Sequence, residues 1–174
     1  MDTLRNSTLR FFNALLVTVI ASVLLGAYIY EFTYKQYPCP LCYLQRLAMI
    51  LICFGPLLNL KFGFRSLHYS ISLFAAVFGA GVSIRQIALR LFSKAPATDI
   101  PVWGHQLYVW ALFVFAASIL AVGLLLLLLR EKESKEAFKT NLFEKFSAGF
   151  IFLIIIANIV TSIFVCGMGF CRDT

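Results

Sequence analysis

Charged residues are scarce in this chain. Of its 174 residues, 13% are Asp, Glu, Lys or Arg, whereas 61% are hydrophobic. A soluble domain is about half apolar and about a quarter charged, so the composition excludes an ordinary water-soluble protein. The length leaves room for only one helical bundle, and we expect a single integral membrane domain over residues 1–174.

The sequence also lacks a low-complexity tract, a lipidation motif and an internal repeat. A convincing signal-peptide cleavage site is missing too. Arg5 and Arg10 precede the first apolar stretch, but that stretch is too long for the core of a signal peptide, and no small-x-small site follows it. We therefore interpret it as an uncleaved first membrane span.

Acidic residues are outnumbered by basic ones, eight against fifteen, which gives a net charge of +7. A nucleic-acid-binding protein would gather this surplus on one polar face. Here the basic residues are spread over short loops between apolar stretches, which argues against a nucleic-acid partner. The pattern is instead typical of charges that orient a protein in a bilayer.

Five apolar stretches come close to the roughly 20 residues that a helix needs to cross the hydrocarbon core. We therefore predict an all-α fold, a polytopic membrane bundle with five spans and with lipid around it. The expected spans are, approximately, Phe11–Tyr30, Tyr43–Leu60, Tyr69–Phe92, Leu107–Leu129 and Ser147–Val165.

The basic residues also predict the orientation, because they accumulate in the cytoplasmic loops of membrane proteins. With the N-terminus in the cytoplasm, nine basic residues fall inside and six outside, and three of the outer six lie within predicted helices. The segment Arg130–Lys145, basic at five positions, is the clearest indication. Five crossings then place Glu31–Pro40 and the C-terminal tail on the outer side, where disulfides persist.

The most reactive group of residues lies just before the second span, where Cys39 and Cys42 are two residues apart. Pro40 suits the first turn of a helix, so Cys39 is predicted near the N-cap and Cys42 in the first turn. The free N–H groups and the dipole of a helix N-terminus stabilise a thiolate. Arg46 follows Cys42 by four residues, beneath it on the same helix face, where it would lower the thiol pKa and could polarise a ligand's carbonyl oxygen.

Three interpretations of this pair are open: a redox dithiol, a metal site, or a structural disulfide beside an arginine that reaches toward the interface. A structural bridge gains little from closing so short a loop. Cys-x-x-Cys pairs are typically redox-active or metal-binding. Haem attachment is excluded, because Tyr43 rather than His follows Cys42. We favour the redox pair and predict no metal.

A second pair, Cys166 and Cys171, follows the fifth span and encloses two glycines. Such a flexible segment can close a small disulfide and present it to another thiol, and an exposed short loop is more reducible than a packed bridge. The alternative is a bridge that only ties down the terminus. Cys53 differs, because it lies mid-span among apolar residues and is predicted to act as a small packing residue.

Arg85 and Gln86 fall in the outer third of the third span. An arginine inside a span usually has a partner. The only carboxylates predicted near the outer half are Glu31 and Asp99, both placed close to the surface. We therefore expect Arg46 and Arg85 to bind backbone carbonyls, water, a thiolate or a ligand oxygen; Arg85 could instead simply extend toward the interface.

A Cys-x-x-Cys after the first span, with Gln45–Arg46 just beyond it, resembles the DsbB family of bacterial inner-membrane enzymes. The resemblance runs through the first four spans and rests on Cys39, Cys42 and Arg46, with Arg85–Gln86 at the family's Arg-His/Gln position. It implies a four-helix DsbB-like core, to which this chain adds a fifth helix. It also implies that Cys42 contacts a quinone, that Arg46, Arg85 and Gln86 belong to the quinone site, and that Cys39 exchanges with a distal cysteine pair.

The chain departs from the family pattern in the loop between the third and fourth spans, which has no cysteine. Topology therefore assigns the distal role to Cys166 and Cys171. The resulting expectation is a quinone-dependent disulfide oxidase with both cysteine pairs in the periplasm. It would reoxidise a periplasmic DsbA-like thioredoxin-fold protein and reduce ubiquinone or menaquinone.

Two alternatives stay open at this point. One is a reductase of the vitamin K epoxide reductase type, which also has a Cys-x-x-Cys at a helix end near a quinone pocket but passes electrons the other way. The other is a non-enzymatic membrane protein that binds metal or assists assembly through four thiolates.

Overall fold

The structure is a computed structural model, and it describes residues 2–35, 39–92, 101–129 and 141–166, with side chains from residue 6 onward and up to residue 163. These residues form five helices that are long and apolar enough to cross a membrane, which confirms the predicted all-α, five-helix fold. The helices are α1 Asp2–Tyr34, α2 Pro40–Phe62, α3 Ser66–Phe92, α4 Leu107–Leu129 and α5 Leu142–Cys166.

The helices differ from the predicted spans mainly at their ends. The prediction for α4 matches at both ends, whereas α1 continues for four residues beyond Tyr30 and α5 begins five residues before Ser147. An apolar stretch marks only the part of a helix that lies in hydrocarbon, and polar residues can extend the helix past it. This difference brings Glu31 and Glu144 into helical positions.

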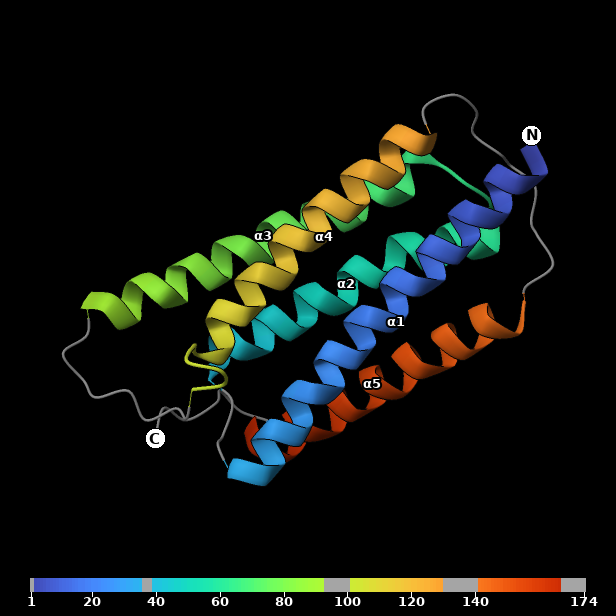
Figure 1. Cartoon of the computed structure of the whole chain (residues 1–174). Coiled ribbons are helices and arrows are strands. Elements are labelled where there is room, and N and C mark those ends of the chain that lie inside the picture. The colour runs from blue at the N-terminus through green and yellow to red at the C-terminus, as the bar shows by residue number, and fades with distance from the viewer. Residues whose placement is uncertain (1, 36–38, 93–100, 130–140, 167–174) are drawn as a thin grey trace.

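Figure 1 shows α2 and α1 in the middle of the bundle, with α3 and α4 on one side and α5 on the other. The strongest contacts follow the same order: α2 with α3, α3 with α4, α1 with α2, and α1 with α5. Helix α5 is thus held mainly by α1. That residues 1–174 form one domain stays a prediction.

Successive helices run in opposite directions, so alternate ends meet (Figure 1). The C-terminal ends of α1, α3 and α5 lie at the same end of the bundle as the N-terminal ends of α2 and α4. We call this the cysteine end, because α2 begins there next to Cys39. The shared end agrees with five crossings; which side of a membrane it faces stays a prediction.

Close packing between α2, α3 and α4 depends on two glycines. A Cβ added to Gly55 would lie 2.2 Å from Ser72 Oγ and 2.3 Å from the His68 carbonyl oxygen. One added to Gly79 would lie 2.2 Å from the Phe115 ring. Since atoms cannot approach so closely, larger residues at these positions would force the helices apart.

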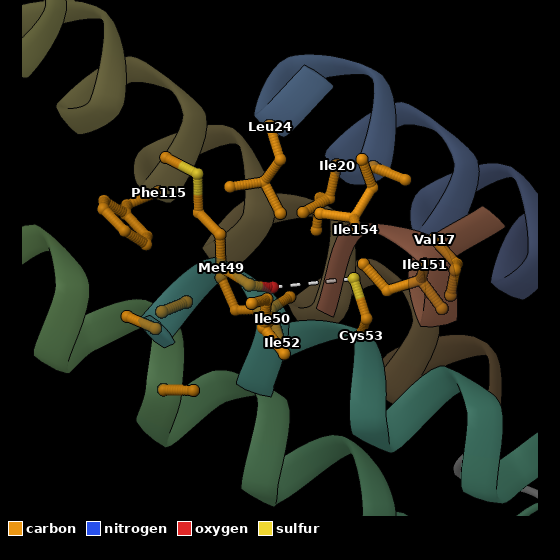
Figure 2. Packing of buried hydrophobic residues seen from close by; sticks show 14 of the residues in the cluster. Val17, Ile20, Leu24, Met49, Ile50, Ile52, Cys53, Phe115, Ile151 and Ile154 are labelled. Carbon is orange, nitrogen blue, oxygen red and sulfur yellow. Dashed lines mark hydrogen bonds between the residues drawn. The ribbon is translucent and has the colours of Figure 1, made fainter. Parts of the chain in front are cut away.

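Apolar side chains from all five helices form the main core, part of which Figure 2 shows. Val17, Ile20 and Leu24 of α1 face Ile151 and Ile154 of α5 across this core, and all five are almost fully buried.

The core also contains Cys53, which is completely buried and donates a hydrogen bond of 3.5 Å to the Met49 carbonyl (Figure 2). Cys53 therefore packs as a small hydrophobic residue, and its thiol is hydrogen-bonded within its own helix. This confirms the packing role predicted for it.

Among the side chains that the structure describes, three hydrogen-bonded pairs join α1 to α5, and we call these three pairs the α1–α5 polar seam. They are Arg10 Nε to Glu144 Oε1 at 2.7 Å, Thr18 Oγ1 with Ser147 Oγ at 2.8 Å, and Tyr28 Oη to Asn158 Oδ1 at 2.8 Å. Hydrogen bonds between helices in a membrane add to van der Waals packing in selecting which faces meet. The seam therefore helps to hold one face of α5 against α1.

Candidate redox site

Cys39 and Cys42 occupy the N-terminus of α2, as predicted from Pro40. Cys39 is the N-cap, with φ −72° and ψ 160°, and its sulfur accepts the Cys42 N–H at 3.3 Å. Pro40 fills the first helical turn, where its missing N–H leaves nothing unsatisfied. The two sulfurs lie 2.6 Å apart, both partly buried and both as free thiols. They can form a disulfide with very little movement.

The pKa of Cys39 is lowered to about 6, chiefly because the Cys42 thiol donates a hydrogen bond to its sulfur. Burial opposes this effect, while the backbone N–H groups of Cys42 and Leu41 and the positive charge of Arg90 add to it. A thiolate is the attacking form in disulfide exchange. Cys39 is therefore suited to attack a disulfide at neutral pH.

Gln86 of α3 reaches both sulfurs. Its Nε2 lies 3.4 Å from Cys39 Sγ and 3.6 Å from Cys42 Sγ, and the side chain is buried. The resemblance pointed to Gln86, but its contact with both thiols is a result of the fold.

Gln45 and Ser83 are two further site residues that the sequence reasoning missed. Gln45 Nε2 donates to Gln86 Oε1 at 2.9 Å and to Ser83 Oγ at 3.1 Å, and all three side chains are buried. A signal was present, because an amide inside an apolar span must find hydrogen-bond partners. It could not say which partners.

Arg46 lies one turn below Cys42, and only 8% of it is exposed. Its Nη2 binds Glu31 Oε2 at 2.6 Å, and its guanidinium lies over the Tyr28 ring at 4.5 Å and the Tyr43 ring at 5.8 Å. The expectation that Arg46 has no carboxylate partner is wrong. Glu31 reaches it because α1 stays helical beyond the apolar stretch and packs beside the first turns of α2.

One part of the Arg46 guanidinium is unused. Its Nη1 is buried and has no hydrogen-bond partner among the described residues. A buried charged donor without a partner is unfavourable, so this atom suits a ligand that brings an acceptor oxygen.

Arg85 lies next to Gln86 in the sequence but not at the site, since its side chain is exposed while that of Gln86 is buried. Neighbouring helix residues point about 100° apart, so only one of them can face the thiols. A role for Arg85 in binding stays a prediction.

The distal cysteine pair falls at the edge of what the structure describes. Cys166 is the last residue of α5, at the cysteine end, but its side chain and the whole of Cys171 lie outside the described residues, as does Asp99. Whether Cys166 reaches Cys39 therefore stays a prediction. In the parts of the chain that the structure describes, no three His, Cys, Asp or Glu side chains gather as a metal site would require.

A groove of about 500 Å³ runs between α1 and α5 near the cysteine end. Its walls are almost entirely apolar and include Leu25, Tyr28, Ile29, Leu153, Ala157 and Thr161. Tyr28 belongs both to this groove and to the aromatic surroundings of Arg46. The groove therefore shares one wall residue with the surroundings of Arg46.

A family model described as disulfide bond formation protein DsbB matches residues 9–98, which is 90 of the 174 residues. The chain belongs to the DsbB family. The match covers most of α1 and all of α2 and α3, with the two thiols and their polar partners, whereas α4 and α5 lie beyond it. Comparisons with curated proteins and with solved structures gave no significant match.

Membership of the DsbB family identifies a multi-pass membrane protein of disulfide bond formation, with disulfide oxidoreductase activity in general. The redox interpretation of Cys39 and Cys42 fits this family.

Proposed function

We propose that this protein is a quinone-dependent disulfide oxidase that reoxidises a periplasmic, DsbA-like thioredoxin-fold protein. The main support is one observation: two sulfurs 2.6 Å apart at the start of a membrane helix, one turn above a buried arginine with a free donor. This arrangement joins a thiol-exchange site to a site that a lipid-soluble acceptor can enter.

The residues around Arg46 fit a quinone. The unpaired Nη1 can donate to a quinone carbonyl oxygen, and the apolar groove between α1 and α5 can hold an isoprenoid tail. A bound quinone, ubiquinone or menaquinone, would supply a two-electron oxidant within the membrane. Arg46 would then hold and polarise the carbonyl, Gln86 would stabilise the thiolate, and the aromatic rings of Tyr28 and Tyr43 would exclude water.

The proposed exchange begins outside the membrane. A thiolate of the reduced partner attacks the Cys166–Cys171 disulfide, and its second thiol resolves the mixed disulfide, which leaves the partner oxidised and the distal pair reduced. The distal dithiol then reduces the Cys39–Cys42 disulfide by the same chemistry, with Cys39 as the exchanging sulfur. The Cys39–Cys42 dithiol would then be oxidised back to its disulfide, and its two electrons and two protons would pass by way of Cys42 to a quinone, which would become the quinol.

This proposal includes the predicted location, a bacterial inner membrane with the N-terminus in the cytoplasm and both cysteine pairs in the periplasm. The basic segment Arg130–Lys145 supports this orientation. Membrane-impermeant thiol reagents applied to intact spheroplasts after reduction would test it: both pairs should be labelled, and labelling of one pair only would contradict it.

The central experiment mixes the purified full-length protein with a reduced DsbA-like protein and a soluble ubiquinone analogue. We expect the partner to become oxidised while quinone absorbance is lost, and Cys39→Ser or Cys42→Ser to stop both. Cys53→Ala is the matched control and should stay active, because Cys53 is buried in the core. Absence of quinone reduction by the unaltered protein would overturn the proposal. Reduction of an oxidised partner by a quinol, in the reverse mixture, would favour the reductase alternative.

A separate variant tests the distal pair. Cys166→Ser should prevent oxidation of the partner, while small thiols should still reduce the Cys39–Cys42 pair and drive quinone reduction. Full partner oxidation by Cys166→Ser would show that Cys39 and Cys42 act on the partner directly.

A further inference from the structure

Behind the two thiols lies a chain of hydrogen bonds that runs in one direction. It begins at the backbone carbonyl of Gly79, which accepts the Ser83 hydroxyl at 3.1 Å. Ser83 Oγ in turn accepts from Gln45 Nε2 at 3.1 Å, and the same Nε2 donates to Gln86 Oε1 at 2.9 Å.

The direction of this chain follows from its first member. A backbone carbonyl can only accept a hydrogen bond, so the Ser83 hydroxyl must donate its single hydrogen to the Gly79 carbonyl. Toward Gln45, the Ser83 oxygen can therefore only accept. Gln45 must then turn its NH₂ group toward Ser83, and the second N–H of that group points at Gln86. Gln86 is thereby left with its oxygen toward Gln45 and its own NH₂ group toward the sulfurs.

The orientation of Gln86 matters because the two ends of an amide have opposite effects on a thiolate. An N–H donor stabilises negative charge on sulfur, whereas a carbonyl oxygen at the same place repels it. Gln86 Nε2 lies within 3.6 Å of both sulfurs. A flipped amide would therefore turn a stabilising contact into a repulsive one without any other movement.

We propose that Gln45 and Ser83 are positioning residues that hold the Gln86 amide with its N–H groups toward Cys39 and Cys42. By stabilising the thiolate, this chain of hydrogen bonds favours the reduced form of the Cys39–Cys42 pair and makes its disulfide a stronger oxidant. Neither residue touches a sulfur; each acts through Gln86. This inference rests on the proposed redox role of the Cys39–Cys42 pair but needs neither a quinone nor a soluble partner.

The charged groups near the thiols do not belong to this chain of hydrogen bonds. Arg90 of α3 acts on Cys39 through its charge, and Arg46 of α2 and Glu31 of α1 form their pair one turn deeper. Helix α4 contains no charged residue, and the charged residues of α5, Glu144 and Lys145, lie at its N-terminal end, opposite the cysteine end. Replacing Gln45 or Ser83 leaves all these charges in place, so a change in the thiols would come from the amide.

The test is the equilibrium of the Cys39–Cys42 pair with glutathione, measured at pH 7 by alkylation and mass spectrometry on the purified full-length protein without quinone or partner. Gln45→Met keeps the length of the side chain but removes the donor. We expect the equilibrium to shift about tenfold toward the disulfide, the size of one charge-assisted hydrogen bond. For a two-electron couple this is a potential about 30 mV lower.

Ser83→Ala should shift the equilibrium in the same direction by about threefold, since Gln45 keeps its contact with Gln86 but loses the group that orients it. Ser72→Ala is the matched control: Ser72 is also a buried serine of α3, and its hydroxyl donates to the Ile52 carbonyl away from the thiols. It should leave the equilibrium unchanged. If Gln45→Met does not fold, Ser83→Ala and Ser72→Ala decide the matter.

A double-variant comparison separates positioning from general destabilisation. With Gln86→Met already present, Gln45→Met should have no further effect on the equilibrium, because the amide through which Gln45 acts is gone. The proposal is overturned if Gln45→Met and Ser83→Ala leave the potential unchanged, or if Gln45→Met shifts it equally in the Gln86→Met background. A failure of quinone reduction would leave this equilibrium measurable, so the two proposals fail separately.

Discussion

Two arginine–glutamate pairs lie at opposite ends of the bundle, and they use the guanidinium group differently. Arg10 binds Glu144 through both Nε and Nη2, and the second carboxylate oxygen also accepts the Asn141 N–H. Arg46 binds Glu31 through Nη2 only, and its buried Nη1 has no partner among the described residues.

The difference shows which pair is available for chemistry. A guanidinium that faces its carboxylate with two parallel donors gains both energy and a fixed geometry, so the Arg10 pair suits a structural contact between α1 and α5. The Arg46 pair keeps one buried donor free, beside the thiols and the apolar groove. Leaving that donor unpaired is unfavourable for folding, which is typical of a group that serves a ligand.

The largest effect is expected when each arginine is replaced by methionine. Arg46→Met removes the charged donor proposed to bind the quinone and should raise the apparent quinone KM by about ten- to a hundredfold. Arg10→Met should leave this KM unchanged and lower the thermal unfolding temperature instead. Steady-state quinone reduction and thermal unfolding in detergent check both. Equal KM changes in the two variants would remove the functional distinction between the pairs.

The cysteine end can be probed further by pH. Because the pKa of Cys39 is lowered to about 6, its thiolate is present above that pH and is lost as the pH falls through it. Alkylation of the reduced protein should therefore rise up to about pH 7 and then level off, whereas an ordinary thiol with a pKa of about 8.5 would continue to rise. Mass spectrometry after timed labelling gives the rates, and buried Cys53 should stay unlabelled in the folded protein. A continued rise to pH 9 would contradict a thiolate stabilised at neutral pH.

A smaller effect should come from the carboxylate at the opposite end. Glu144→Gln keeps the shape of the side chain but removes the charge that Arg10 binds, and we expect about 1–2 kcal/mol less stability. Thermal unfolding, followed by the exposure of Cys53 to a thiol reagent, measures the loss. The glutathione equilibrium of Cys39–Cys42 should not change; a shift there would mean that the α1–α5 polar seam affects the thiols directly.

The smallest effect is expected in the middle of the seam. Ser147→Ala removes the hydrogen bond to Thr18 and should cost about 0.6 kcal/mol, the average for hydrogen bonds between membrane helices. Thermal unfolding checks it, and quinone reduction should be unaltered. A loss of stability as large as that of Glu144→Gln would show that the Thr18–Ser147 hydrogen bond contributes most to the attachment of α5 to α1.

Much of the fold could be predicted because each helix has its own apolar stretch. The interval 107–129 matches α4 at both ends, and Pro40 correctly predicted that α2 begins directly after Cys39. The ends of α1 and α5 were predicted less well, because hydropathy does not register polar residues that continue a helix. The predicted spans therefore left both Glu31 and Glu144 outside the helices.

The contacts within the site were harder to predict than its residues. Cys39, Cys42 and Arg46 stood out by type and spacing, and Gln86 by the family resemblance. The structure brings Gln86 into contact with both thiols and places Arg46 one turn below Cys42. The Gln45–Gln86 contact depends on how α2 and α3 are rotated against each other, and Gly55 helps to fix that rotation by letting the two helices approach closely. The spacing of residues within one helix gives no information about how that helix is rotated against another.

By itself, the sequence determined that the chain enters a membrane as five helices and that a dithiol stands at the start of the second, because hydropathy and helix-start signals act over short stretches of chain. Only the tertiary structure decided that Glu31 meets Arg46, that Gln86 rather than Arg85 faces the sulfurs, and that Gln45 donates a hydrogen bond to Gln86. These contacts join residues 15 to 47 positions apart, and they arise from the packing of whole helix faces.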